Sequence, residues 1–168
     1  MAHMQDHFVK WLRDAHAMEE QGLTMLVAQS KRIENYPQLK ARIDQHLVET
    51  QGHVRALQGL LDRLPVGPSR IKGLAGKLTA TAQGLGGALN SDEVIKGALS
   101  GYAFENAEIG AYRVLIAAAD ELGELEAKAT FEWILEEEVA MADWLASNLD
   151  DTTRLFLLRD ERELQASR

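Results

Sequence analysis

The sequence predicts an all-α fold in which four long helices form two antiparallel hairpins joined by a long crossover. Proline occurs only three times in 168 residues, and Pro65 and Pro68 lie together near the middle of the chain. The stretches on either side are therefore free of helix breakers. Apolar residues recur in them at helical spacing, and a glycine-rich segment separates the two halves. We expect a single domain, residues 1–168, since domains of about 100 to 200 residues are usual.

The first half is predicted to contain two helices, over about residues 6–33 and 37–63. Pro37 suits the first turn of the second helix, where a missing N–H costs little. Pro65 and the residues after it end that helix. Because only a few residues join the two helices, they should lie antiparallel. The inward apolar positions are Phe8, Leu12, Ala15, Leu23 and Leu26 in the first helix, and Leu39, Ile43, Leu47, Leu57, Leu60 and Leu64 in the second.

The segment over residues 65–90 is rich in glycine and other small residues, which predicts a long crossover. Asn90 and Glu93 have the spacing of a capping box, in which each side chain accepts a backbone N–H at the start of a helix. A third helix is expected over about residues 91–122. It should end at Gly123, because glycine readily adopts the left-handed conformation of a C-terminal cap.

The fourth helix is predicted over about residues 125–148, and the tail, residues 150–168, is expected to form a short amphipathic helix. Two short-looped hairpins joined by one long crossover are the connectivity of ferritin-like bundles, in contrast to simple up-down-up-down bundles. The predicted fold class is therefore a ferritin-like four-helix bundle with a short C-terminal helix.

Composition excludes several classes of function. The formal net charge is −8 and the basic residues are scattered, so no nucleic-acid partner is expected. No apolar run is long enough to span a membrane and no secretory signal is present, so we expect a cytoplasmic protein with no membrane partner. The chain has no cysteine, which excludes disulfides and thiolate metal sites and leaves His, Asp and Glu as the strong ligands.

The two halves resemble a distant internal repeat. An offset of 88 positions pairs Glu20 with Glu108 and Glu49 with Glu137. A pseudo-twofold arrangement of the hairpins would bring these four carboxylates toward one centre. Because an unpaired buried carboxylate loses several kcal/mol of hydration, a bound cation is the natural way to offset that cost.

The second helix carries a further candidate ligand. Glu49 and His53 are four residues apart between Leu47 and Leu57, so both should project from the same face of the helix. His46 lies three residues before Glu49 on that face. It could bind metal or support a ligand, and it stays outside the primary set.

The second hairpin supplies the remaining carboxylates. Glu105 and Glu108 are three residues apart among apolar neighbours, which directs both toward the interior. The fourth helix carries three consecutive glutamates, residues 136–138. The repeat selects Glu137, whereas the apolar stripe alone favours Glu138, and we rank Glu137 first.

Oxygen-rich sites with one or two imidazoles suit iron or manganese. The four-helix template uses one Glu from each of two helices and a Glu-x-x-His pair from each of the other two. The chain meets this template only in part, because Glu49 is followed by His53 at the fourth position and Glu137 has no following histidine. We expect two metal ions, with iron as the first choice and manganese as the second.

Several segments of the two hairpins resemble the YciE/YciF family of ferritin-like proteins. They are Glu20–Leu23, Pro37–Lys40 and His46–His53 in the first half, and Phe104–Tyr112, Glu121–Gly123 and Leu135–Glu138 in the second. The resemblance implies a di-metal site, a homodimer and a link to bacterial stress responses. Carried over by position, it implies the metal ligands Glu20, Glu49, His53, Glu105, Glu108 and Glu137. The chain departs from the family pattern in its glycine-rich crossover and at Ala142, where an acidic residue is frequent.

Two functions remain open at this stage. The first is a di-iron or di-manganese protein that reacts with a small oxidant, oxygen or peroxide, by ferroxidase-, peroxidase- or catalase-like chemistry. The second is a non-enzymatic stress or scaffold protein whose acidic interior is vestigial. Metal analysis would separate them.

Overall fold

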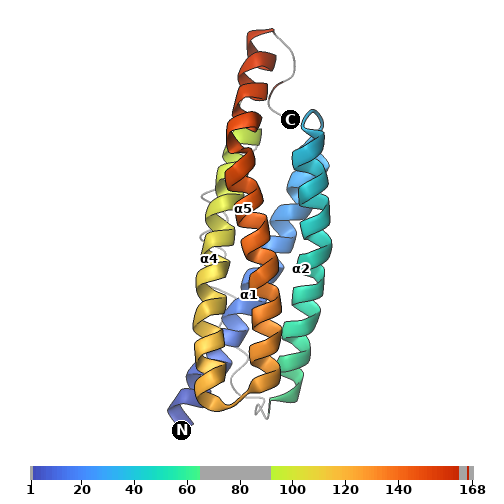
Figure 1. Cartoon of the computed structure of the whole chain (residues 1–168). Helices are drawn as coiled ribbons and strands as arrows, with labels where there is room; N and C mark the ends of the chain where they lie inside the picture. Colours follow the sequence, from blue (N-terminus) through green and yellow to red (C-terminus); the bar gives the residue numbers. More distant parts are fainter. Residues whose placement is uncertain (1, 65–91, 163–165, 167–168) are drawn as a thin grey trace.

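A computed structural model describes residues 2–64, 92–162 and 166. Within these residues the chain forms four helices and no strand: α1 (Ala2–Arg32), α2 (Pro37–Arg63), α4 (Glu93–Leu122) and α5 (Leu125–Glu161) (Figure 1). The predicted all-α class is confirmed. The predicted crossover, residues 65–90, lies outside the described residues.

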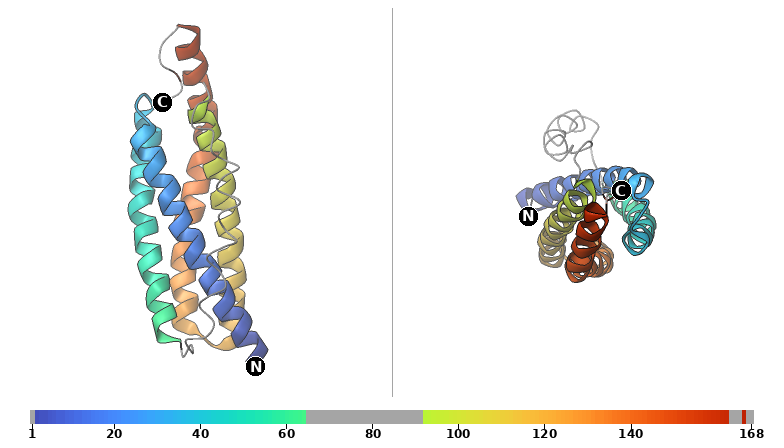
Figure 2. Two further views of the ribbon diagram at one scale, coloured as in Figure 1. Left: turned by 180° about the vertical axis from the view of Figure 1, so that it is seen from behind. Right: turned by 90° about the horizontal axis from the view of Figure 1, so that it is seen from above.

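The helices form a bundle in which each one packs against two neighbours. The two hairpins α1–α2 and α4–α5 are closed into a bundle by contacts of α1 with α4 and of α2 with α5. The view down the bundle shows the four helices around a common axis (Figure 2). α2 and α4 run in the same direction (Figure 1), as in ferritin-like bundles.

Proline and glycine mark helix ends as the sequence predicts. Pro37 occupies the first turn of α2. Gly123 ends α4 with φ of 71°, and the N–H of Glu124 donates to the carbonyl oxygen of Ala119 at 2.9 Å, which is the long bond of a Schellman motif. The predicted capping box is not tested, because Asn90 lies outside the described residues. Asp92 precedes α4 without a side-chain capping bond.

The C-terminal part of the chain differs from the prediction. In place of a separate short helix after residue 150, α5 continues without a break to Glu161. The reason is local, because residues 149–162 contain neither glycine nor proline and so nothing terminates the helix near Asn148. The end of α5 extends beyond the other three helices (Figure 1).

The core has an apolar cluster on either side of a polar layer. One cluster joins the start of α1 to the loop between α4 and α5, and includes Phe8, Leu12 and Phe131, each at most 1% exposed. The other lies near the loop between α1 and α2 and includes Leu26, Ile43 and Leu145. Each fully buried side chain of this kind stabilises the fold by roughly 1.5 to 3 kcal/mol. The stability from these clusters permits charged groups to be buried between them.

No helix among the described residues is both long enough and apolar enough to cross a membrane.

Candidate metal centre

Six ionisable side chains are buried together in the polar layer between the two apolar clusters. None is more than 3% exposed, and all four helices contribute. α1 supplies Glu19, α2 supplies His46 and His53, α4 supplies Glu105 and Glu108, and α5 supplies Glu138. Charged residues are almost never buried so completely unless they are paired or bind a metal.

The side chains form two groups of three around one shared carboxylate. Glu19, His53 and Glu138 offer ligand atoms that lie within 4.8 Å of one another, and so do His46, Glu105 and Glu138. Glu138 directs Oε1 to His53 Nδ1 at 2.9 Å and Oε2 to His46 Nε2 at 3.3 Å. We call these groups the Glu19 triad and the Glu105 triad. Glu138 belongs to both, as expected of a carboxylate that bridges two ions.

Each histidine is held from behind by a partly exposed glutamate. His46 Nδ1 lies 2.8 Å from Glu49, whereas His53 uses its other nitrogen, Nε2, to contact Glu137 at 2.7 Å. A carboxylate that accepts from one ring nitrogen fixes the tautomer and leaves the other nitrogen free to bind a metal. The two histidines therefore present different atoms to the triads, His46 its Nε2 and His53 its Nδ1.

The two supporting glutamates are themselves anchored. Arg42 Nη1 donates to Glu49 Oε2 at 3.1 Å, and Gln45 Nε2 donates to Glu49 Oε1 at 2.7 Å. Trp133 Nε1 donates to Glu137 Oε1 at 3.0 Å. These bonds hold Glu49 and Glu137 in place on the outer side of the layer.

Several buried oxygen atoms in the centre accept no hydrogen bond of good geometry among the described residues, although three of them lie within 3.3 Å of a histidine nitrogen as ion pairs. They are Glu105 Oε2, Glu108 Oε1 and both carboxylate oxygens of Glu138. Leaving a buried acceptor unsatisfied costs about 1 to 3 kcal/mol, and more when the group is charged. Four such oxygens in one small volume need positive charge nearby, which either protonated histidines or a bound cation can supply.

The spacing of the atoms fits metal ions. The histidine nitrogens lie 2.9 to 3.3 Å from the carboxylate oxygens within the two triads. Divalent ions bind nitrogen and oxygen at about 2.0 to 2.2 Å, so neighbouring ligand atoms around one ion lie about 3 Å apart. Four buried carboxylates also match the charge of two divalent ions when both imidazoles are neutral.

Without an ion, the charges of the layer perturb one another. Burial alone would lower the pKa of His46, but the carboxylates of Glu105, Glu138 and Glu49 raise it to about 11. Burial would also lower the pKa of His53, but the carboxylates of Glu138 and Glu19 raise it to about 10. Both imidazoles therefore carry a proton at neutral pH in the metal-free protein, where that proton takes the part of a cation.

The pKa of each buried carboxyl group depends on whether the group contacts a protonated histidine. Burial raises the pKa of Glu108 well above its usual range, and the charges of Glu138, Glu19 and Glu105 raise it further. Burial would also raise the pKa of Glu138, but the two histidines lower it. Carboxylates that cannot all ionise without a nearby positive charge are typical of functional sites.

Tyr112 extends the layer toward the apolar cluster on the Phe131 side. Its hydroxyl donates to Glu19 Oε1, and the side chain is fully buried. Burial and the charge of Glu19 raise the pKa of Tyr112 well above its ordinary value. The phenol therefore keeps its proton and fixes the orientation of the Glu19 carboxylate.

A glycine on α1 makes room for the α4 carboxylate. A Cβ atom at Gly22 would lie 3.0 Å from Phe104 Cε1 and 3.6 Å from Glu108 Oε1. A side chain at this position would press on the Phe104 ring, which covers the layer on this side. The close contact of α1 with α4 at this point gives a physical reason for a glycine at position 22.

The structure corrects two of the inward positions predicted from sequence. Glu20 faces solvent, with its side chain 61% exposed and 3.7 Å from His16, while its neighbour Glu19 is buried. Adjacent helical residues point about 100° apart, so only one of each pair can face the interior. On α5, Glu138 is the buried residue and Glu137 is 30% exposed.

The other predicted residues lie at the centre or directly behind it. His53 and Glu105 belong to the triads, and Glu108 lies beside them in the buried layer. Glu49 is 17% exposed and contacts the centre through His46. His46, which the sequence analysis left outside the primary set, is 1% exposed and belongs to the Glu105 triad. Whether any of these residues binds metal stays a prediction.

The signal that could have found Glu19 and His46 was present in the sequence. Each continues a stripe of inward positions spaced alternately three and four residues apart. The stripe runs through Phe8, Leu12, Ala15, Glu19, Gly22 and Leu26 on α1, and through Leu39, Ile43, His46, Thr50, His53 and Leu57 on α2. The internal repeat was given more weight than this stripe, and it selected the wrong neighbour.

Comparison with known proteins places the chain among ferritin-like bundles. Residues 3–158 match the family described as "Domain of unknown function (DUF892)". The crystal structure of XCC3681 from Xanthomonas campestris is 38% identical over 95% of this chain and 99% of that chain, with a TM-score of 0.78. The E. coli stress protein YciF is 24% identical over 90% of this chain and 97% of that chain, with a TM-score of 0.74.

A third solved structure carries the fold name itself. It is a two-domain protein from Anabaena variabilis with DJ-1/ThiJ/PfpI-like and ferritin-like domains. It is 22% identical over 88% of this chain and 37% of that chain, with a TM-score of 0.63. This likeness concerns the fold alone.

Proposed function

The chain belongs to the DUF892 family, and on this premise we propose that it is a two-metal carboxylate protein. Its resemblance to YciF and related ferritin-like proteins is confirmed. It binds two ions of iron or manganese and reacts with dioxygen or peroxide. A buried layer of carboxylates and histidines that could bind metal supports the first part. The reaction is inferred from the chemistry of such donor sets.

One observation carries the proposal, namely the single buried carboxylate shared by two histidine-containing triads. Glu138 lies between His46 and His53. Glu19 completes the group on one side and Glu105 completes it on the other. Glu108 adds a buried oxygen without a partner.

Bound iron or manganese would supply the electrons for reduction of the oxidant. The protein's own residues prepare that chemistry. Glu49 and Glu137 hold the outer ring nitrogens of the histidines in fixed tautomers, and Tyr112 holds a proton at Glu19. The apolar clusters on both sides exclude bulk water, which strengthens every electrostatic interaction within the layer.

Metal analysis joined to a turnover assay tests the proposal. Protein prepared without chelators should contain or take up two iron or manganese ions per chain and consume peroxide, and Glu138→Gln should lose both properties. Glu132→Gln, an exposed position six residues earlier on α5, is the matched control. If the wild-type chain binds neither ion and its melting temperature is unchanged by them, the non-enzymatic stress or scaffold function is favoured instead.

Two further properties are proposed from the resemblance. We propose a homodimer, which light scattering after gel filtration would detect as twice the chain mass of 18.6 kDa. We also propose a role in a stress response, because the relative YciF is described as a stress protein. Loss of the gene should then lower survival under peroxide.

A further inference from the structure

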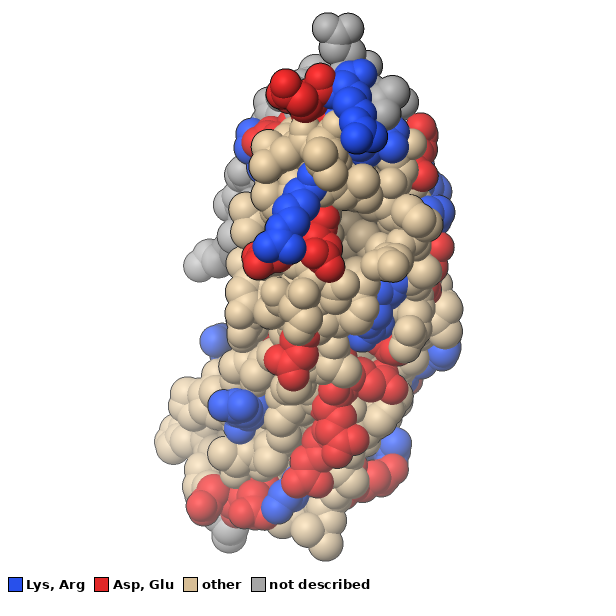
Figure 3. Space-filling model, turned by 45° about the horizontal axis from the view of Figure 1, so that its top comes forward, with Lys and Arg blue, Asp and Glu red and all other residues tan. Residues whose placement is uncertain are grey.

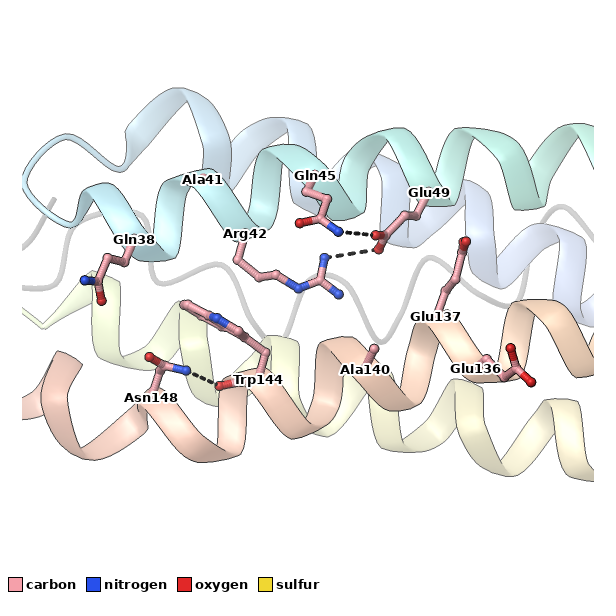
Figure 4. Close-up of a pocket in the computed structure, with 10 residues that line it drawn as sticks. All are labelled: Gln38, Ala41, Arg42, Gln45, Glu49, Glu136, Glu137, Ala140, Trp144 and Asn148. Atoms are coloured by element: carbon pink, nitrogen blue, oxygen red, sulfur yellow. Dashed lines mark hydrogen bonds and ion pairs between the residues drawn. The ribbon is translucent and has the colours of Figure 1, made fainter.

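A groove between α2 and α5 lies directly outside the candidate metal centre. It encloses about 600 Å³. Its outer walls are formed by four exposed residues, Ala41, Gln45, Glu136 and Ala140. Glu49 from α2 and Glu137 from α5 enter it from opposite sides (Figure 4). The groove is therefore open to solvent, and on its inner side it is bounded by Glu49 and Glu137, which support the two histidines.

The two glutamates connect solvent to the buried layer. Glu49 is 17% exposed and lies 2.8 Å from His46, while Glu137 is 30% exposed and lies 2.7 Å from His53. Both histidines and the shared Glu138 behind them are at most 1% exposed. An ion bound between the glutamates would be one histidine side chain away from Glu138.

The opposite side of the layer is closed by comparison. The cavity lined by Gly22, Phe104, Glu105 and Glu108 has a free volume of only about 10 Å³, which is about enough for one water molecule. Phe104 packs against Gly22 there. Of these two cavities, the α2–α5 groove gives the wider access to the centre.

The charge of the groove determines which solute it favours. Glu49, Glu136 and Glu137 line it together with a single basic residue, Arg42, which is 8% exposed and already paired to Glu49. Acidic side chains also form a band on this side of the molecule (Figure 3). A cleft lined by one sign of charge concentrates ions of the opposite sign, so small cations are favoured over anions.

We propose that the α2–α5 groove is the port through which hydrated divalent cations reach the centre, with Glu49 and Glu137 as the groups that take the ion from solvent. This inference rests on the proposed two-metal function. The ion enters between the two glutamates, displaces Arg42 from Glu49, and passes between His46 and His53 to the triads. The same path serves release, since the cavity on the other side is far smaller.

If the groove is the entry path, blocking it should slow both uptake and release of metal. A role of Glu49 and Glu137 as ligands alone does not predict this. Ala140→Trp would fill the groove from α5 without touching the buried layer. Uptake of Co(II), followed by its visible absorption, and release into excess chelator should both slow by about tenfold or more, while the Kd stays within about twofold. Blocking a path changes both rates equally and leaves the equilibrium unchanged.

A matched control separates blocking from a general effect of added bulk. Ala129 is exposed on the same helix and does not line the groove, so Ala129→Trp should leave both rates unchanged. If Ala140→Trp takes up Co(II) as fast as Ala129→Trp, the port is wrong.

A second variant tests the same path through charge. Glu136 lines the groove and is exposed, so Glu136→Gln should slow uptake severalfold at low ionic strength and lose this effect at high salt, where charges are screened. Glu132→Gln is the control. Equal uptake rates for the two variants at low salt would overturn the port alone, whereas a wild-type chain that binds no Co(II), Mn(II) or Fe(II) would overturn the proposed function and the port together.

Discussion

Replacing Glu138 by glutamine should weaken metal binding at both triads at once, because this residue is the only one common to them. The substitution keeps the size and shape of the side chain, so the apolar clusters on either side are undisturbed. It removes the one negative charge that the two triads share and replaces one of the two carboxylate oxygens with an NH2 group, which cannot bind an ion. Glu19→Gln and Glu105→Gln should each affect one triad only.

The size of the effect follows from mass action. Metal at about 100 times its Kd stabilises a protein by about 2.7 kcal/mol per site, or about 5.4 kcal/mol for two. With about 2 to 4 °C per kcal/mol for a protein of this size, the melting temperature should rise by about 11 to 22 °C. If each triad of the Glu138 variant loses about 100-fold in affinity, the same metal concentration gives about 0.4 kcal/mol per site, or a rise of about 2 to 3 °C in total.

The assay compares the metal-induced rise in melting temperature, with and without Mn(II), across four proteins. The comparison within each variant removes any change in the stability of its metal-free form. Wild type should show the full rise, Glu138→Gln almost none, and Glu19→Gln and Glu105→Gln about half each. A Glu138 variant that keeps the full rise and two bound ions would refute the assignment of a shared carboxylate.

Three other outcomes are expected. Glu49→Ala and Glu137→Ala should each weaken Mn(II) affinity by about 10- to 100-fold, the usual effect of removing a carboxylate behind a ligand histidine, while calorimetry still finds two ions. Mn(II) affinity should rise by about tenfold or more per pH unit from about pH 6 to 8, because the buried histidines must release protons to bind an ion. Their pKa values in the metal-free protein are about 11 for His46 and about 10 for His53. An affinity that does not change with pH would contradict this. Gly22→Ala should destabilise the protein by about 1 to 3 kcal/mol in urea unfolding, because the added methyl meets Phe104, whereas Gly110→Ala, with nothing within 4 Å of its new methyl group, should be neutral or stabilising.

Helix positions followed from local rules that act within a few residues. Pro37 and Gly123 begin and end helices because of their own backbone preferences, and both were placed correctly from sequence. The extension of α5 to Glu161 was missed because amphipathic spacing after residue 150 was interpreted as a new helix. The absence of a helix breaker before Glu161 was the stronger signal.

The composition of the centre was partly visible in the sequence. Glu105 and Glu108 were predicted to face inward because apolar residues surround them, and His53 because it lies between apolar neighbours, and all three are buried. The choice between adjacent acids was less secure. An internal repeat relates the two hairpins only approximately, so it selected Glu20 and Glu137, where the inward stripes selected Glu19 and Glu138.

By itself, the sequence determined four amphipathic helices, a pair of hairpins and an interior that contains acids and histidines, because these depend on spacing along single helices. Only the tertiary structure decided which atoms meet. Which nitrogen of His53 faces the layer, and that Glu138 is shared by the two histidines, depends on contacts between α2 and α5 across the bundle. Such contacts join residues more than 80 positions apart, and no spacing rule within one helix encodes them.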